Sequence, residues 1–222
     1  MQDLHFYFYL RHMYDIPYFK APDNKDVIAF MQQHPFIMLC GADEEGKPVA
    51  THIPVLIEER EGKLFLLAHV MRKQDHTKAF ETNPNVLAIF HGPHTHVSAS
   101  WYENQQVAST WNYQAVHARG VLKFLDDKAL HDLLAKLTSH FENNSDSPSL
   151  VHKMNESYVH NLMKAIVAFE IEVIAIQHTF KLSQNHSRQN YENIITQLST
   201  KDDDAKAIAH VMKDLQNTIH PA

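Results

Sequence analysis

Short strand-like segments joined by turns constrain the fold of this chain more than any other feature. Residues 49–57 alternate in hydrophobicity, and a turn at residues 58–62 separates them from an apolar run at residues 64–69. Further strands are predicted at residues 36–40, 86–90, 95–100, 110–124 and 166–176. The Gly92-Pro93 pair is expected to interrupt the strand structure between residues 86–90 and 95–100. Strands this closely spaced are typical of a small antiparallel barrel, which the last strand is expected to close.

Helices are predicted around these strands. Asp23 can cap a helix that Pro35 ends, and the apolar face of this helix consists of Val27, Phe30 and Met31. Other helices are expected within residues 71–84, from Asp126 onward, at residues 154–163 and along the tail after Asn185, where Asp202, Asp203 and Asp204 suit a helix N-terminus. These elements predict a mainly β fold of the α+β class, with peripheral helices and a helical C-terminal tail.

The composition indicates a globular protein with one main body. The chain has 222 residues, of which 44% are hydrophobic and 21% are charged. Its opening segment is aromatic, but Asp3, Arg11 and Asp15 interrupt it, so neither a signal peptide nor a membrane span is expected. The single cysteine, Cys40, excludes an internal disulfide framework. These features favour a cytoplasmic protein.

The charge distribution argues against direct binding to nucleic acid. The formal net charge is −6, and the lysines and arginines are scattered, whereas phosphate binding needs a basic stripe. The 18 histidines reduce this negative charge. With an ordinary pKa of ~6.5, about a quarter of them carry a proton at pH 7, which adds roughly +4.

Both tryptophans lie in one stretch, residues 88–124. Trp101 and Trp111 are each surrounded by residues that can form hydrogen bonds. Polar groups beside a flat apolar surface suit a planar ligand or a partner protein better than a plain core, where unpaired polar groups cost free energy.

Metal and nucleophile sites receive less support from the same stretch. His94 and His96 are two residues apart on a predicted strand and so face the same way, but no cysteine or paired acid accompanies them. His91, His94 and His96 are better explained as parts of the turn and strand that position the tryptophans. We therefore predict no metal site. Ser98 and His117 lack an acidic third member, and no catalytic residue is identified.

Several motifs of the chain resemble those of the PaiB-like proteins. The motifs are MYDIPYF at residues 13–19, ATHIPVL at 50–56, HGPHTHVSASWY at 91–102, STWNYQAVHARG at 109–120, FEIEV at 169–173 and KLSQN at 181–185. That family is described as FMN-binding split barrels and, in bacilli, as negative regulators of sporulation and degradative-enzyme genes. The resemblance covers residues 13–185, which leaves residues 1–12 as an N-terminal extension and residues 186–222 as the helical tail.

The resemblance implies a six-stranded antiparallel split β-barrel that binds FMN as a homodimer, with flavin at the subunit interface. The chain has no GxGxxG motif and no P-loop, so side chains must hold the flavin phosphate. Arg72, Lys73 and Lys78 lie where related flavoproteins place their phosphate cations, and arginine can bind phosphate with two parallel hydrogen bonds. A solvated, charged helix face is the alternative explanation for these three residues.

The resemblance also suggests residues for the rest of the flavin. Thr51, His52 and His69 are expected to face the ring and the ribityl chain, although His69 could instead be a strand-end histidine with satisfied hydrogen bonds. Trp111 and Asn112 are expected to wall the flavin or to seal the dimer interface, where large aromatic residues are common.

Lys181 and Gln184 are expected to donate to the phosphate or to the ring edge, either within one chain or across the dimer. A loop that caps the following helix is the alternative explanation for both.

Three functions follow, in order of preference. The first is an FMN-binding protein that acts as an oxidoreductase or a flavin-dependent sensor. The second is a PaiB-like regulator that acts without bound flavin and affects transcription either indirectly or through a partner. The third is a haem-binding split barrel, which rests on the histidine count and on the fold.

Overall fold

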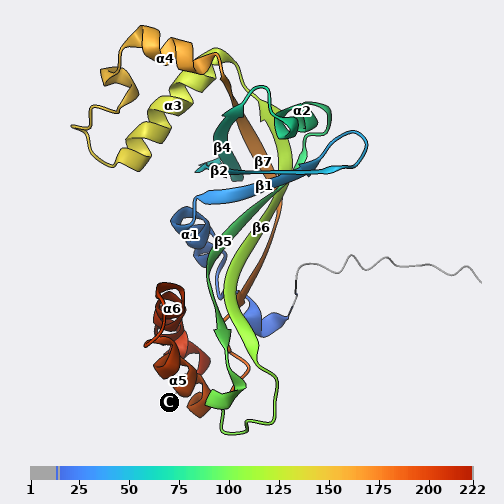
Figure 1. Cartoon of the computed structure of the whole chain (residues 1–222), viewed down its shortest axis with the longest axis vertical. Coiled ribbons are helices and arrows are strands. Elements are labelled where there is room, and N and C mark those ends of the chain that lie inside the picture. Colours follow the sequence, from blue (N-terminus) through green and yellow to red (C-terminus); the bar gives the residue numbers. More distant parts are fainter. Residues whose placement is uncertain (1–13, 15, 222) are drawn as a thin grey trace, which may run out of the picture. The chain divides into compact units, whose positions relative to one another are not determined.

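The structure of the chain is a computed structural model that describes residue 14 and residues 16–221 (Figure 1). The predicted extension at residues 1–12 lies outside this part of the chain. The strands are β1 (Phe36–Ala42), β2 (Pro48–Pro54), β3 (Leu56–Arg60), β4 (Lys63–Met71), β5 (Asn85–Val97), β6 (Thr110–Phe124) and β7 (Ile166–Lys181). The α-helices are α1 (Asn24–Gln33), α2 (Asp75–Thr82), α3 (Asp127–Glu142), α4 (Glu156–Met163), α5 (Arg188–Leu198) and α6 (Asp203–Ile219). Short 3-10 helices are η1 (Pro17–Phe19), η2 (Ala99–Trp101) and η3 (Val151–Lys153).

The strands form one antiparallel sheet in the order β2-β1-β5-β6-β7-β4-β3. The registers of β1 with β2 and β5, and of β4 with β3 and β7, are all antiparallel. β2 and β4 also contact each other, although four strands separate them in the sheet order. The sheet must therefore curl, which is the geometry of the predicted split barrel with peripheral helices.

The six strands that the family resemblance implied are wrong in number, because the sheet has seven. The expected strand at residues 49–57 is two strands. Pro54 has no N–H group, and the N–H of Val55 donates to the carbonyl of Pro35 over 2.9 Å, outside the sheet. β2 therefore ends at Pro54 and pairs with β1, whereas β3 begins at Leu56 and pairs with β4.

Two other strand boundaries differ from the prediction. β5 runs without interruption through the Gly92-Pro93 pair. Its register with β1 ends at Ile89, so the missing N–H of proline removes no hydrogen bond of that pairing. The turn after β3 is shorter than residues 58–62, because Glu61 and Gly62 form it alone, both with positive φ as in a type I′ hairpin turn.

The predicted helices are confirmed, together with their caps. The side chain of Asp126 accepts a hydrogen bond from the N–H of Ala129 at the start of α3, over 2.8 Å. Asp202 caps α6 in the same way by accepting from Ala205 over 2.9 Å, and the next two aspartates lie in the first turn. No helix in the described residues has the length and apolar character needed to cross a membrane.

The chain divides into two compact units. The barrel unit consists of residues 28–91 and 116–176, and the terminal unit consists of residues up to 27, residues 92–115 and residues from 177 onward. Strands β5, β6 and β7 contribute residues to both units.

In the barrel unit, α3 and α4 pack against β4 and β7. The apolar face of α3, with Leu130, Leu133 and Leu137, is buried in a cluster that includes Leu67 of β4 and Ala168 of β7. Burying one leucine side chain stabilises the fold by roughly 1.5–3 kcal/mol. This cluster therefore anchors the helices to the sheet.

In the terminal unit, α5 and α6 pack against each other (Figure 1). The hydroxyl of the buried Tyr191 in α5 donates to the carbonyl of Met212 in α6 over 3.0 Å. The side-chain amide of Asn193 in α5 donates to the carbonyl of Trp101 over 3.1 Å. The helical tail thus packs on its own chain.

β6 approaches β7 closely at Gly120. A Cβ atom at this position would lie 2.4 Å from the carbonyl oxygen of Glu172 and 2.5 Å from Cγ2 of Ile171. A backbone oxygen inside the sheet cannot move aside as a flexible side chain can, so the pairing of these strands requires glycine here.

We expect Gly120→Ala to lower the free energy of unfolding by about 1–3 kcal/mol or more, because the added methyl group overpacks the sheet. Urea unfolding of the purified protein measures this change. The control is Val121→Ala, one residue further along β6 and 41% exposed, which should change the free energy by less than about 0.5 kcal/mol. Wild-type stability of Gly120→Ala would contradict the close approach.

Candidate functional site

The cationic segment that was predicted to hold phosphate follows the end of β4. The buried hydroxyl of Thr77 donates to the carbonyl of Met71 over 2.7 Å and fixes the first turn of α2 against this strand end. Lys73 and Lys78 are exposed there, and within the described residues neither takes part in an ion pair. Two cations without anionic partners therefore lie at the start of α2.

The third predicted cation, Arg72, has a partner. Its Nη2 atom lies 2.7 Å from Oδ1 of Asp127 in the first turn of α3. Both side chains are well exposed, so the pair contributes at most about 1 kcal/mol. A phosphate could compete with this carboxylate for the guanidinium group.

Helix α2 is held against β1 and β2. Phe80 of α2 is buried, and a Cβ atom at Gly41 of β1 would lie 2.7 Å from Cε1 of its ring. This close packing places α2, with Lys78, beside β2, the strand of Thr51 and His52.

The predicted ring-facing residues lie on β2 and β4, which contact each other. Thr51 is half-buried, whereas the exposed ring of His52 stacks on that of Phe36, with centroids 6.2 Å apart. His69 is half-buried on β4, and its Nδ1 atom is buried without a hydrogen-bond partner among the described residues. Burial lowers the pKa of His69, which favours the neutral ring.

The unpartnered nitrogen of His69 bears on what this part of the barrel can hold. Leaving a buried polar atom unpaired costs about 1–3 kcal/mol, and no described residue offsets this cost for Nδ1. A bound group that reached this atom would offset the cost. Lys73 and Lys78 suit a phosphate, and Thr51 and His69 suit a polar chain or ring. These residues together fit a ligand that has both parts.

Two predicted residues of the terminal unit are engaged in internal hydrogen bonds. Asn112 is fully buried, and its Oδ1 atom accepts from the hydroxyl of Ser183 over 3.0 Å. The side-chain amide of Gln184 accepts from the N–H of Leu182 and donates to the carbonyl of Phe180 in β7, and these bonds support the positive φ at Ser183. Both side chains hold the loop after β7, and a contact with flavin stays a prediction for them.

Trp111 is 53% exposed at the start of β6. Its ring centroid lies 6.1 Å from that of His94 and 5.8 Å from that of His96, so both histidines point to the same side of β5, as predicted. In the part of the chain that the structure describes, no group of three or more histidine, cysteine, aspartate or glutamate residues could hold a metal ion.

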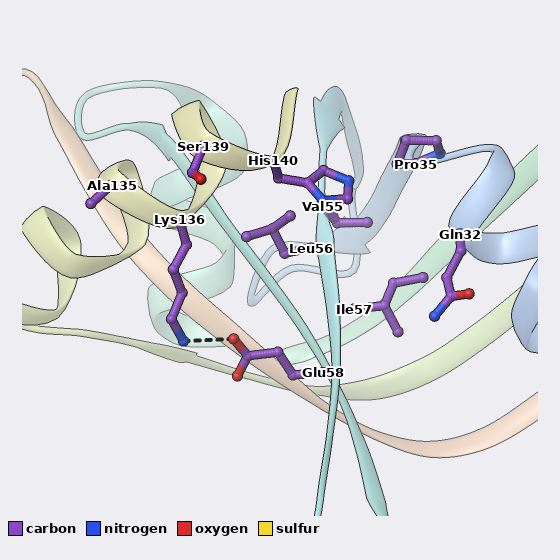
Figure 2. A pocket seen from close by; sticks show the side chains of 10 residues that line it. All are labelled: Gln32, Pro35, Val55, Leu56, Ile57, Glu58, Ala135, Lys136, Ser139 and His140. Carbon is purple, nitrogen blue, oxygen red and sulfur yellow. Dashed lines mark hydrogen bonds and ion pairs between the residues drawn. The ribbon is translucent and has the colours of Figure 1, made fainter. Parts of the chain in front are cut away.

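A cavity of about 780 Å³ in the barrel unit holds none of the ten predicted residues (Figure 2). It lies between β3 and the last turns of α1 and α3, with Val55 and Ile57 among its apolar lining residues. Nζ of Lys136 lies 2.6 Å from Oε1 of Glu58 (Figure 2). Lys136 is therefore already neutralised by a carboxylate. A phosphate would find more unpaired positive charge in the segment after β4 than in this cavity.

Aromatic residues around Lys181 were not predicted as site residues. Tyr14, Tyr18, Phe19 and Tyr102 line a pocket of about 390 Å³ together with Lys181. Three of these aromatic residues belong to the MYDIPYF motif, whose density of flat side chains is the signal that could have indicated them. Their meeting with residues 102 and 181 could not be seen from the sequence.

A curled antiparallel sheet with cations at the end of one strand places this protein among the split-barrel proteins. The chain belongs to the family described as "Putative FMN-binding domain", whose model matches residues 13–175.

Comparisons with individual proteins agree with this family and fold. The chain is 34% identical over 203 residues to the protease synthase and sporulation protein PAI 2 of Bacillus subtilis (strain 168), covering 91% of this chain and 97% of that protein. Its fold is similar to that of an FAD and heme binding protein from Mycobacterium smegmatis, with a TM-score of 0.53, 16% identity and 72% of each chain covered. A putative 5-nitroimidazole antibiotic resistance protein from Bacteroides thetaiotaomicron has a TM-score of 0.52 and 15% identity, with 71% of this chain and 84% of that chain covered.

We expect the stability of the protein to fall as the pH is lowered through about 6.5. In the folded state burial holds the pKa of His69 below its ordinary value, so the unfolded chain binds this proton more readily. Stability is therefore greatest above the unfolded-state pKa and decreases below it. Burial lowers the pKa of His34, His117 and His186 as well, and these residues act in the same direction.

Urea unfolding at pH 7.5, 6.5 and 5.5 measures this dependence. His69→Gln should show a shallower loss of stability than the wild type, because one titrating group is removed. His52→Gln, at an exposed position on the neighbouring strand β2, is the matched control. If the free energy of unfolding of His69→Gln depends on pH as steeply as that of the wild type, the lowered pKa of His69 does not contribute to this dependence.

Proposed function

We propose that this protein binds FMN through its barrel unit and functions as a homodimer with the flavin at the subunit interface. The observation that carries this proposal is the pair of exposed cations, Lys73 and Lys78, at the start of α2, in a chain that belongs to the putative FMN-binding domain family. The proposal assigns the phosphate to this segment and the rest of the cofactor to Thr51, His52 and His69.

The phosphate of FMN is a dianion that needs cations and hydrogen-bond donors. Lys73 and Lys78 supply charge, and Arg72 is within the same segment. Gln74, the N-cap residue of α2, forms no side-chain capping bond, so this helix end has N–H groups for an anion. Asp75 in the first turn is the opposing charge, and its carboxylate accepts from the N–H of His76 over 2.8 Å.

When bound, FMN supplies electron or hydride transfer, and the protein binds and orients it. The neutral ring of His69 offers its buried Nδ1 atom to a polar group of the cofactor. Thr51, half-buried on β2, offers a hydroxyl on the neighbouring strand. An oxidoreductase or a flavin-dependent sensor are both consistent with this assignment.

An exposed apolar face supports the homodimer. Phe36 and Met38 of β1 are 64% and 38% exposed, and the register places His52 of β2 opposite Met38. Residues 36 and 38 share one face of the strand, so His52, a predicted flavin contact, lies beside two exposed apolar side chains. A second copy of the chain would bury this face and exclude water from the flavin ring.

We expect Lys73→Gln combined with Lys78→Gln to weaken FMN binding at least tenfold, because each lysine contributes a charge-assisted interaction with the phosphate. Quenching of flavin fluorescence on titration measures the affinity. Asp75→Asn should instead strengthen binding by removing the opposing charge. Lys47→Gln combined with Lys213→Gln is the control, since both positions are exposed and lie outside this segment.

No flavin absorbance in the protein as isolated, together with no quenching on addition of FMN, would exclude the proposed cofactor. Equal affinity of the Lys73 and Lys78 double variant and the wild type would overturn the phosphate assignment alone.

We expect Phe36→Glu to produce a monomer that binds FMN weakly, because the charge would be buried without a partner in the interface. Analytical ultracentrifugation measures the assembly. Phe141→Glu, which changes an exposed phenylalanine on α3, should remain dimeric. A wild-type protein that sediments as a monomer, with or without FMN, would refute this part of the proposal.

A regulatory role is the second candidate, and the similarity to the sporulation protein PAI 2 over 97% of its length favours it. The net charge of −6 and the scattered basic residues favour an effect through a partner protein rather than direct contact with DNA. Purified protein should therefore fail to shift promoter DNA at low salt. A salt-sensitive shift would establish direct binding instead.

A further inference from the structure

Lys181 occupies a pocket that the proposed flavin site does not use. The described residues that line this pocket of about 390 Å³ all belong to the terminal unit, and they lie in or beside η1, within residues 102–110 and within residues 181–190. Lys181 is half-buried in it, and its ammonium group donates to the hydroxyl of Thr110. An ammonium group has three N–H bonds, so two remain for a ligand.

The walls beside this ammonium group are flat and aromatic. Nζ of Lys181 lies 5.8 Å from the ring centroids of both Tyr14 and Phe19, and these two rings stack with an interplanar angle of 14°. Tyr102 also lines the pocket, and its ring packs on that of His186 with centroids 4.5 Å apart. Phe19 and Tyr102 are buried, so the ring surface open to a planar group belongs to Tyr14 and Tyr18, which are 49% and 55% exposed.

Among the described residues that line the pocket, Lys181 is a cation without an acidic partner. No aspartate or glutamate is among the described residues that line it, and Lys181 forms no ion pair with any described residue. Burial lowers the pKa of His186, and the nearby charge of Lys181 lowers it further, so the neutral form of this histidine is favoured. The N-terminus of α5 adds partial positive charge, because His186 and Asn190 at this helix end also line the pocket. A partly desolvated cation of this kind is stabilised by an anion.

We propose that this pocket binds a small, flat organic anion of the aromatic carboxylate class, as a second ligand in addition to the flavin. The carboxylate accepts from Lys181, and the ring lies against the exposed ring of Tyr14. A single ammonium group with no arginine fork suits a monoanionic carboxylate better than a phosphate dianion. The site is independent of the proposed FMN contacts, because none of the barrel-unit residues lines it.

Ligand-observed NMR on the full chain tests this proposal, with benzoate as the probe and benzamide as its neutral counterpart. Benzoate should bind, and benzamide should bind at least tenfold more weakly. Lys181→Gln should weaken benzoate binding about tenfold or more, which corresponds to about 1.4 kcal/mol. The control is Lys201→Gln, which removes a lysine of the same unit that lies 5.2 Å from the Trp101 ring and does not line the pocket.

A second pair of variants keeps the test valid if Lys181→Gln folds poorly. Val107 lines the pocket and is 47% exposed, so both aspartate and asparagine can be placed there without burying a polar group. Val107→Asp should weaken benzoate binding through charge repulsion, whereas Val107→Asn should leave it within about twofold of the wild type. Circular dichroism confirms that both variants are folded.

Three outcomes would overturn the proposal. The first is no benzoate binding to the wild type. The second is binding of inorganic phosphate at this site with the same affinity as benzoate, which would indicate a general anion site. The third is competition between benzoate and FMN, together with loss of FMN binding in Lys181→Gln, which would assign the pocket to the flavin. Failure of FMN to bind while benzoate binds would refute the proposed function only.

Discussion

The connection between β2 and β3 is the constraint on which the rest of the barrel unit depends. These strands lie at opposite ends of the sheet order, yet Val55 alone separates them in the chain. A flat sheet of seven strands cannot have its two edges one residue apart, so the sheet must curl until they meet. Pro54 interrupts the hydrogen bonding, and the N–H of Val55 bonds to Pro35 instead. This break allows one continuous stretch to pair with β1 on one side and β4 on the other.

Curling of the sheet also brings together the residues proposed to bind FMN. Thr51 and His52 lie on β2, and His69 lies on β4, with four strands between them in the sheet order. α2 adds Lys78 because Phe80 packs where β1 has a glycine. The same contacts that stabilise the barrel thus place hydroxyl, imidazole and ammonium groups from three elements in one region.

In the terminal unit, hydrogen bonds from polar side chains tie loops and helices together. Asn112 bonds to Ser183, Tyr191 bonds to the backbone of Met212, and the amide of Gln184 supports its own loop. These bonds satisfy groups that would be costly to leave unpaired. Lys181 stands apart from them, because its ammonium group has a hydroxyl as a neighbour but no carboxylate among the described residues. This contrast between satisfied amides and an unbalanced cation supports assigning a ligand to the aromatic pocket.

The sequence by itself determined the positions of most strands and helices, the caps at Asp126 and Asp202, and the family. Period-two alternation and short turns indicated the strands, Asp126 and Asp202 marked helix starts, and the motifs at residues 13–185 indicated a split barrel. The tertiary structure alone decided the split at Val55, the continuity of β5 through Pro93 and the meeting of Lys181 with Tyr14. Hydrophobic periodicity reports which face of a segment is buried, but the strand that receives each N–H and the neighbour of each side chain depend on long-range pairing.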